Sequence, residues 1–364
     1  MLVNFFPSRS LALYVGRTFL WRCLAMLAML VMVLQILDLL SEAGNVLAYP
    51  GNGDAQLWRY VGLRVPEIVS RFLPFSVLLG TLVTLATLNA NSEVISMKAG
   101  GLSAHQILAP LMIVSLGVAV ISFVFNERVV VRAEATLSVW EKAHFGPMPR
   151  EQGSKANVWV MDGDDLVRAG FISGTGTHVT LNDVTIYNRH GDRLVTVIHA
   201  PRGSYAGKGW NLKNATSFDV IRSSSQRLGD IHFGDSVRPD QFTLSSVDAD
   251  GLSFWQLRDA IKTLRAAGRP VASLEGSLWH KVTEPLSSLL MPLLGSVAAF
   301  GVARSGRLFV RAVIGMALGF TFFVADNFAL SMGSLGVYPP ILAALAPLLL
   351  FFLVGEAVLV TTEE

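Results

Sequence analysis

Charged residues are scarce in this chain of 364 residues. Asp, Glu, Lys and Arg make up 15% of it and hydrophobic residues 52%, whereas an ordinary soluble domain has about 25% charged residues. This balance excludes a soluble enzyme and a disordered chain. The formal net charge of +2 also excludes a nucleic-acid-binding protein with a basic face. An integral membrane protein remains, because the apolar residues are clustered.

Cysteine is scarce as well. Cys23 is the only one, so the chain has neither an intramolecular disulfide nor a cysteine-based metal site. The seven histidines show neither the HxxxH nor the HExxH spacing typical of metal-binding helices. We therefore expect no catalytic centre, no metal and no cofactor in this chain.

Six apolar runs are each long enough to cross a hydrocarbon core of about 30 Å as a helix. The first is longer than the apolar core of a secretory signal and lacks a good cleavage site, so we expect it to be retained. A further interfacial helix is expected at 55–66, before the second span. The six runs cover residues 18–40, 68–90, 106–126, 285–303, 309–332 and 339–360.

Basic residues in short loops predict the orientation, because they concentrate on the cytoplasmic side. The connection at 331–340 contains no charge. We therefore expect both termini in the cytoplasm and the polar middle domain in the periplasm of a Gram-negative bacterium. The residues that support this prediction are Arg9, Arg17, Arg22, Arg304, Arg307 and Arg311.

The polar stretch at 127–252 has the pattern of a β domain. Many short segments of alternating polarity are separated by turn signals, and this favours a sandwich or jellyroll. One of the expected strands covers residues 241–245. The alternation slips by one residue at Asn182-Asp183, as at a β-bulge. An amphipathic helix with a Ser253/Gln256 capping box follows in the linker 253–284, at the membrane surface.

The connection after the second span predicts a short cytoplasmic helix at about 91–101. Asn91 or Ser92 can cap it, Glu93 lies in its first turn, and Gly100-Gly101 ends it. Ser103 and Gln106 form a capping box for the next span. In export permeases such a helix docks on a cytosolic ATPase, but the pattern is also that of an ordinary capped loop.

A few charged residues lie in or near the predicted spans. Asp326 is in the middle of the fifth, where a carboxylate marks either a pathway or a structural hydrogen bond. His280 and Glu284 flank the fourth span. Asp38 and Glu42 lie at the outer end of the first span, and Arg128 and Arg132 lie just outside the third. We expect these four charges to be simply solvated at the interface.

Several segments together resemble the LptF/LptG family of lipopolysaccharide export permeases, nearly end to end. The segments are 14–18, 66–80, 91–101, 244–252, 319–326 and 336–341. Segments 319–326 and 336–341 resemble the LptG branch more than the LptF branch.

The resemblance implies an α-helical membrane protein with six transmembrane helices (3+3) and an inserted periplasmic β-jellyroll domain. Spans one to three would lie in 1–126, the jellyroll in 127–252 and spans four to six in 285–364. Such a chain would be one permease of an ABC transporter that extracts lipopolysaccharide from the inner membrane. The transporter passes it to a periplasmic jellyroll bridge toward the outer membrane.

The resemblance also implies partners. They are an LptF-like permease in a heterodimer, two LptB-like ATPase subunits that bind ATP and Mg, an LptC-like membrane protein and an LptA-like periplasmic bridge. Nucleic acid is not among them. Residues implied to contact the ATPase are Ser92, Glu93, Met97, Lys98 and Gly101. Residues implied to line the substrate path or gate are Leu34, Gln35, Asp38, Phe75, Arg128, Arg132, Phe320, Phe323 and Asp326.

One departure concerns the outer end of the first span. Relatives that export phosphorylated lipid A tend to carry lysines there, whereas this chain has Gln35, Asp38, Ser41 and Glu42. We expect either that Arg59, Arg128 or Arg132 takes their place, or that the substrate headgroup differs.

Other functions remain open. In permeases of other ABC-type lipid or lipoprotein exporters, the large periplasmic domain usually follows the first helix, whereas three spans precede it here. A membrane-bound lipid-modifying enzyme could use Asp326, Glu284 and His280, but we expect these side chains at different depths. A membrane-tethered β scaffold would need only one anchor helix.

Overall fold

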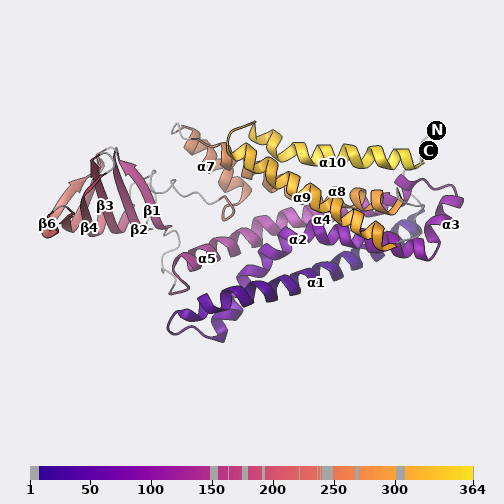
Figure 1. The fold of residues 1–364 in the computed structure, drawn as a ribbon, viewed down its shortest axis with the longest axis horizontal. Coiled ribbons are helices and arrows are strands. Elements are labelled where there is room, and N and C mark those ends of the chain that lie inside the picture. Colours follow the sequence, from indigo (N-terminus) through magenta and orange to yellow (C-terminus); the bar gives the residue numbers. More distant parts are fainter. Residues whose placement is uncertain are drawn as a thin grey trace. The chain divides into compact units, whose positions relative to one another are not determined.

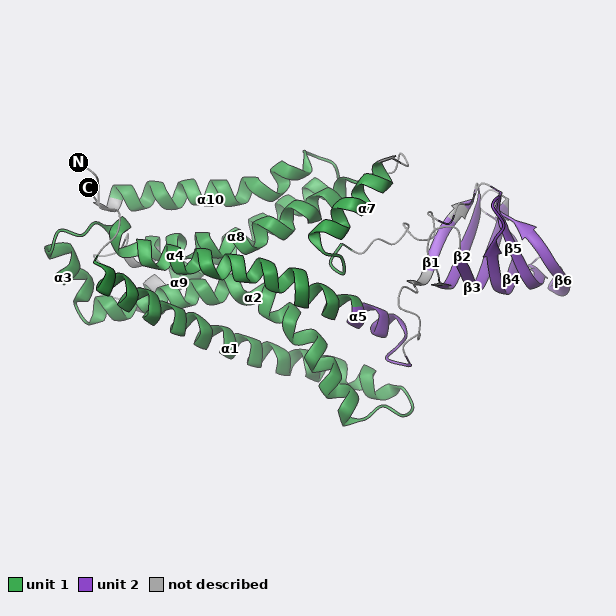
Figure 2. Ribbon diagram, turned by 180° about the vertical axis from the view of Figure 1, so that it is seen from behind, with its two compact units in different colours: residues 1–135, 249–364 green, residues 136–248 purple. Residues whose placement is uncertain are grey.

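The computed structural model comprises two compact units, residues 1–135 with 249–364 and residues 136–248 (Figure 2). The first unit is helical, and the second contains an antiparallel sheet that is inserted between two groups of helices. The structure describes residues 8–147, 155–162, 164–173, 179–190, 193–220, 222–235, 237, 239, 249–266, 270–300 and 308–363. Arg304 and Arg307, which the orientation prediction uses, lie outside this set.

The described helices (Figure 1) comprise long helices and a few short ones. They lie in the first unit, except that residues 136–142 belong to the second. Each expected span coincides with one of the long helices over its described residues. The helices are α1 (Arg9–Ala48), α2 (Asp54–Ala90), α3 (Glu93–Ala99), α4 (Ala104–Phe125), the π-helix η1 (Asn126–Val130), α5 (Val131–Lys142), α7 (Phe254–Ala266), α8 (Ala272–Phe300), α9 (Leu308–Ser334) and α10 (Pro340–Glu363).

Five stretches among the described residues are long and apolar enough to cross a membrane. They are 9–48, 54–90, 104–142, 313–334 and 340–361. Helix α8 is not one of these five, so the sixth span stays a prediction.

Two spans extend further than the sequence predicts. The expected interfacial helix at 55–66 is wrong as a separate element, because α2 is one continuous helix that includes Pro66 and Pro74. The third span also continues past its expected end at 126, through η1 into α5. Hydropathy marks only the apolar part of a helix, so the polar ends of both helices are invisible to it.

Close packing of α1 against α2 forms part of the helical core. Cys23 of α1 is buried against Gly80 of α2, and Phe19, Leu85 and Leu111 belong to the same apolar cluster. A Cβ atom on Gly80 would lie only 2.4 Å from Cys23 Sγ. Glycine is therefore needed at this crossing.

The second unit contains a six-stranded antiparallel sheet in the order β1-β2-β3-β4-β5-β6. The described strands form a meander, and the jellyroll stays a prediction. The strand expected at 241–245 lies outside the described residues. The strands are β1 (Lys155–Asp162), β2 (Asp165–Ser173), β3 (Thr180–His190), β4 (Arg193–Tyr205), β5 (Trp210–Asp219) and β6 (Ser224–Phe233).

The break in the β3 alternation is real, but it is not a bulge. Leu181 and Val184 are both buried, so the inward set shifts by one residue where expected. The pairing of β3 with β4 nevertheless keeps its register across this point. Asp183 has a φ of 54°, and this left-handed conformation moves the phase without an extra residue.

Candidate functional site

Helix α3 is held between two well-defined ends. At its C-terminus Gly101 has a φ of 86°. The Gly101 N–H donates to the Lys98 carbonyl at 3.0 Å, and the Leu102 N–H donates to the Met97 carbonyl at 3.1 Å. This pair of bonds is a Schellman motif, in which a left-handed glycine ends the helix. The expected role of Gly100-Gly101 as a helix stop is confirmed.

The N-terminus of α3 differs in detail from the expectation. Ser92 is left-handed with a φ of 59° and makes no side-chain cap bond. Instead, Glu93 Oε1 accepts from Asn91 Nδ2 at 3.3 Å and from the Tyr14 hydroxyl of α1 at 3.4 Å. Glu93 thus ties α3 to the first turns of α1. The Ser103/Gln106 capping box at the start of α4 is present as expected.

The two faces of α3 have opposite environments. Val94 and Met97 are buried in the core of the helical unit, with Met97 9% exposed. Ile95 on the other face is 66% exposed, and Lys98 is exposed too. Helix α3 therefore holds its inner face in the core and presents Ile95 and Lys98 on its outer face.

Helix α3 lies at the end of the helical unit where α1 begins and α10 ends (Figure 1). Contacts support this arrangement, because Tyr14 of α1 reaches Glu93. His105 Nε2, in the first turn of α4, also lies 3.2 Å from Glu356 Oε2 of α10.

A cavity of about 660 Å³ lies among α2, the η1–α5 helix, α8 and α9. Its wall is partly aromatic, because Phe75 of α2 and Phe323 of α9 both line it. Their rings meet edge to face, with the ring centroids 5.4 Å apart. The wall is also strongly charged. Its ionisable residues are Glu67, Arg71, Glu134, Asp250, His280, Lys281, Glu284 and Asp326.

Three of these ionisable groups converge from α8 and α9. His280 Nδ1 lies 3.7 Å from Asp326 Oδ2, and Glu284 lines the same cavity one helical turn after His280. The expectation that these side chains lie at different depths is therefore wrong. It assumed that His280 and Glu284 flank a span that begins at 285, whereas α8 begins at Ala272.

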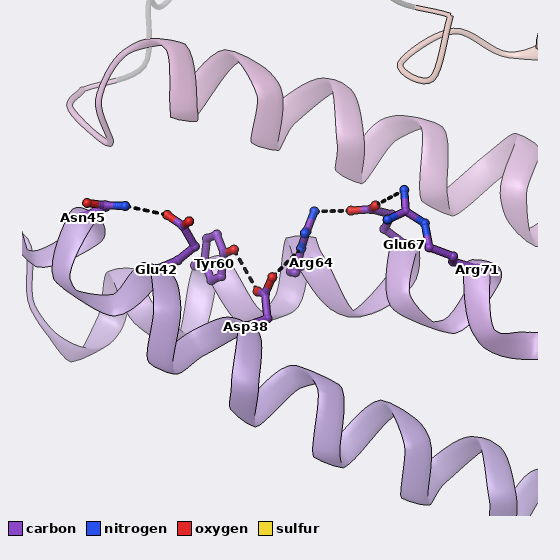
Figure 3. A network of polar contacts seen from close by, with 7 residues as sticks. All are labelled: Asp38, Glu42, Asn45, Tyr60, Arg64, Glu67 and Arg71. Atoms are coloured by element: carbon purple, nitrogen blue, oxygen red, sulfur yellow. Dashed lines mark hydrogen bonds and ion pairs between the residues drawn. The ribbon is translucent and has the colours of Figure 1, made fainter. Parts of the chain in front are cut away.

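A chain of alternating charges runs from α1 along α2 to this cavity (Figure 3). Asp38 of α1 accepts from the Tyr60 hydroxyl at 2.8 Å and from Arg64 Nε at 3.0 Å. Arg64 also pairs with Glu67, and Glu67 Oε1 lies 2.8 Å from Arg71 Nη2. Asp38 is thus not a solvated interface charge but one end of a chain of ion pairs.

A family model described as "Lipopolysaccharide export system permease LptF/LptG" matches residues 13–361. The chain belongs to the LptF/LptG family. Two similar proteins are each named "Lipopolysaccharide export system permease protein LptG". The protein of Escherichia coli (strain K12) is 28% identical over 363 residues, which are 96% of this chain and 97% of that protein. The protein of Haemophilus influenzae (strain ATCC 51907 / DSM 11121 / KW20 / Rd) is 27% identical over 354 residues, which are 93% of this chain and 94% of that protein.

The residues that the LptF/LptG resemblance marks for ATPase contact fall into two groups. Ser92, Lys98 and Gly101 are exposed, and Glu93 is half-buried beside Tyr14. Met97 is buried, so in this structure it anchors α3 to the core instead of forming its outer surface. Helical spacing explains the difference, because Val94 and Met97 share one face of the helix.

The residues marked for the substrate path are also divided. Phe75, Phe323 and Asp326 line the cavity. Asp38 is connected to it through the ion-pair chain. Phe320 is 60% exposed on the surface of α9. The other residues, which are not in the cavity wall, are Leu34, Gln35, Arg128 and Arg132.

The side chains of Arg128 and Arg132 are on the wrong face of their helix for the cavity. Both are exposed, whereas Asn126, Val130 and Glu134 of the same helix line the cavity at four-residue spacing. Gln35 is buried, and neither atom of its amide finds a hydrogen-bond partner within the described part of the chain.

Sequence reasoning missed the charges of α2 that matter most here. Arg64, Glu67 and Arg71 follow at spacings of three and four, the spacing of ion pairs on one helix face. This signal was available, but hydropathy placed residues 55–66 in a separate interfacial helix. Within the described ranges, no group of three or more His, Cys, Asp or Glu side chains could hold a metal ion.

Proposed function

We propose that this chain is the transmembrane permease subunit of a lipopolysaccharide exporter. It takes lipopolysaccharide from the inner membrane and passes it to a periplasmic bridge toward the outer membrane. The observation that carries the proposal is the match of the LptF/LptG family model to residues 13–361. The apolar helices and the central sheet have the composition that such a permease needs.

The proposed topology has six spans, with α8 as the fourth. Both termini and α3 would face the cytoplasm, and the sheet unit would be a periplasmic jellyroll. The joint location of α3, the start of α1 and the end of α10 supports this proposal. The basic residues in the sequence between the fourth and fifth spans support the same orientation.

ATP would be hydrolysed by a partner and not by this chain. Helix α3 would dock on one of two LptB-like subunits through Ile95, Lys98 and the end near Glu93. The other proposed partners are an LptF-like permease, an LptC-like membrane protein and an LptA-like bridge. Burial of Met97 and Val94 supports this role, because a helix that transmits force must be fixed to the body that it moves.

The cavity would form part of the lipopolysaccharide path. A lipid with acyl chains and a charged sugar headgroup needs a wall that is aromatic in one part and polar in another. Phe75 and Phe323 provide the first, and the ionisable groups of α2, α8 and α9 provide the second.

The test is co-purification of the ATPase with the permease pair. Glu93→Lys and Ile95→Asp should each weaken recovery of the ATPase by about tenfold, because each disturbs the proposed contact. Asp259→Lys on the exposed face of α7 is the matched charge reversal and should have no effect. Normal recovery with both α3 variants would reject the docking site.

One observation favours a second function, a membrane-bound enzyme that acts on lipid. His280, Glu284 and Asp326 line one cavity, as an acid–base site would require. Incubation of the purified chain with lipopolysaccharide, followed by mass spectrometry of the lipid, tests this. An unchanged lipid mass would reject the enzyme.

A further inference from the structure

Arg71 has an unusual place among the charged residues of the cavity. Its side chain is 58% exposed, and its Nη2 lies 2.8 Å from Glu67 Oε1. A guanidinium group has five N–H donors in a planar fork. A contact with one carboxylate oxygen therefore leaves donors for another acceptor in the cavity.

The rest of the ion-pair chain is more deeply buried than Arg71. Glu67 pairs with Arg64, and Arg64 pairs with Asp38, which also accepts from Tyr60 (Figure 3). The two carboxylates in the chain therefore balance the two guanidinium groups. Arg71 is the exposed end of this neutral chain, so it is the cation that can exchange its partner most easily.

We propose that Arg71 is the anion-binding residue of the cavity and takes a phosphate group of a phosphorylated saccharide headgroup. The inference rests on the proposed export of lipopolysaccharide and names the residue that selects the headgroup. Phosphate oxygens match the spacing of guanidinium N–H groups and can replace the Glu67 carboxylate. Lys281 of α8 is a second cation in the same wall.

This assignment gives the cavity a cation although the outer end of the first span contains no lysine. Arg128 and Arg132 are exposed on the face of their helix that does not line the cavity, and Arg59 is also outside its wall. The cation is instead supplied by α2.

The carboxylates of the cavity restrict the ligand. They would repel a bare inorganic anion, but they can accept hydrogen bonds from sugar hydroxyl groups. The carboxylate residues of the wall are Glu67, Glu134, Asp250, Glu284 and Asp326. A phosphorylated sugar satisfies both kinds of group, whereas free phosphate satisfies only Arg71. The ligand is therefore the lipid headgroup rather than free phosphate.

The test uses the assembled permease complex in nanodiscs, with a photo-crosslinking amino acid in place of Phe75. Crosslinking is titrated with bisphosphorylated lipid A and with its dephosphorylated form. Arg71→Gln should weaken the apparent affinity for the phosphorylated lipid by about tenfold, because a charge-assisted hydrogen bond is lost. Its affinity for the dephosphorylated lipid should stay unchanged. Arg71→Lys should be intermediate, and Arg128→Gln, the matched control, should behave like the parent.

Glu67→Gln provides an independent variant in case Arg71→Gln does not fold. It removes the carboxylate that competes for Arg71, so affinity for phosphorylated lipid A should rise. Equal or lower affinity would overturn the proposal, as would an Arg71→Gln titration equal to that of Arg128→Gln. Displacement of the lipid by millimolar inorganic phosphate would overturn the headgroup as the ligand. Failure of the unsubstituted complex to crosslink either lipid would instead contradict the proposed export function.

Discussion

Nδ1 of His280 in α8 lies 3.7 Å from Oδ2 of Asp326 in α9. The two residues come from different helices and meet in a cavity that also contains charges from α2. A carboxylate within a span is costly unless a partner or water solvates it. Asp326 lies beside His280 and lines the cavity, so its two roles, structural contact and part of a pathway, are compatible.

This pair predicts a measurable coupling. His280→Gln and Asp326→Asn preserve the size of each side chain, and the double variant completes a thermodynamic cycle. We expect a coupling of about 0.5–1 kcal/mol in the free energy of unfolding in detergent, as for two polar side chains that lie close together without a direct hydrogen bond. Strictly additive losses would mean that the two side chains do not interact.

The crossing of α1 and α2 predicts a position-dependent effect of alanine. Gly80→Ala should lower the free energy of unfolding by about 1–3 kcal/mol, because its Cβ would overlap Cys23 Sγ. Gly62→Ala in the same helix is the control. Apart from the neighbouring backbone of α2, no atom of the described residues lies within 4 Å of that Cβ. This variant should therefore be neutral or stabilise by up to about 1 kcal/mol through helix propensity. Thermal unfolding of both variants distinguishes the effect of packing from that of helix propensity. Equal changes in the melting temperatures of the two variants would contradict crowding between residues 80 and 23.

The end of α3 predicts a difference between two adjacent glycines. Gly101 has a φ of 86°, whereas Gly100 has a φ of −76°. Gly101→Ala should destabilise the end of the helix by about 1 kcal/mol, because alanine is strained in the left-handed region. Hydrogen exchange of the α3 amides should therefore be faster in Gly101→Ala than in Gly100→Ala. The reverse order would argue against the Schellman motif.

The sheet unit predicts unequal roles for two tryptophans. Trp210 is fully buried, and its Nε1 donates to the Val237 carbonyl at 2.9 Å. Trp210→Phe should cost about 1–3 kcal/mol of stability, because it leaves a buried carbonyl without its donor. Trp159 is partly exposed and stacks on Tyr187 at 5.6 Å. Trp159→Phe in the full chain should cost less, and near-UV circular dichroism during thermal unfolding measures both.

Much of the local structure follows from residues that are close in the sequence. The long helices are visible as apolar runs. The cap of α4 by Ser103 and Gln106 and the stop of α3 at Gly101 depend on neighbours within a few residues. Such features are set by local backbone geometry. Which side of α3 is buried was not visible, because the helix has only seven residues and its hydrophobic residues lie on both faces.

The candidate site depends on residues that are far apart in the chain. Asp38 could be read only as an interface charge until its contact with Tyr60 and Arg64 was seen. His280 and Asp326 likewise come from different helices, α8 and α9, and are 46 positions apart in the sequence.

The sequence by itself determined that this is a membrane protein of the LptF/LptG family with an inserted β domain, because hydropathy, helix signals and family motifs are properties of short segments. Only the tertiary structure decided which charges face the cavity. That outcome depends on how far α2 and α8 extend and on how their faces are turned by packing, and no local pattern encodes either.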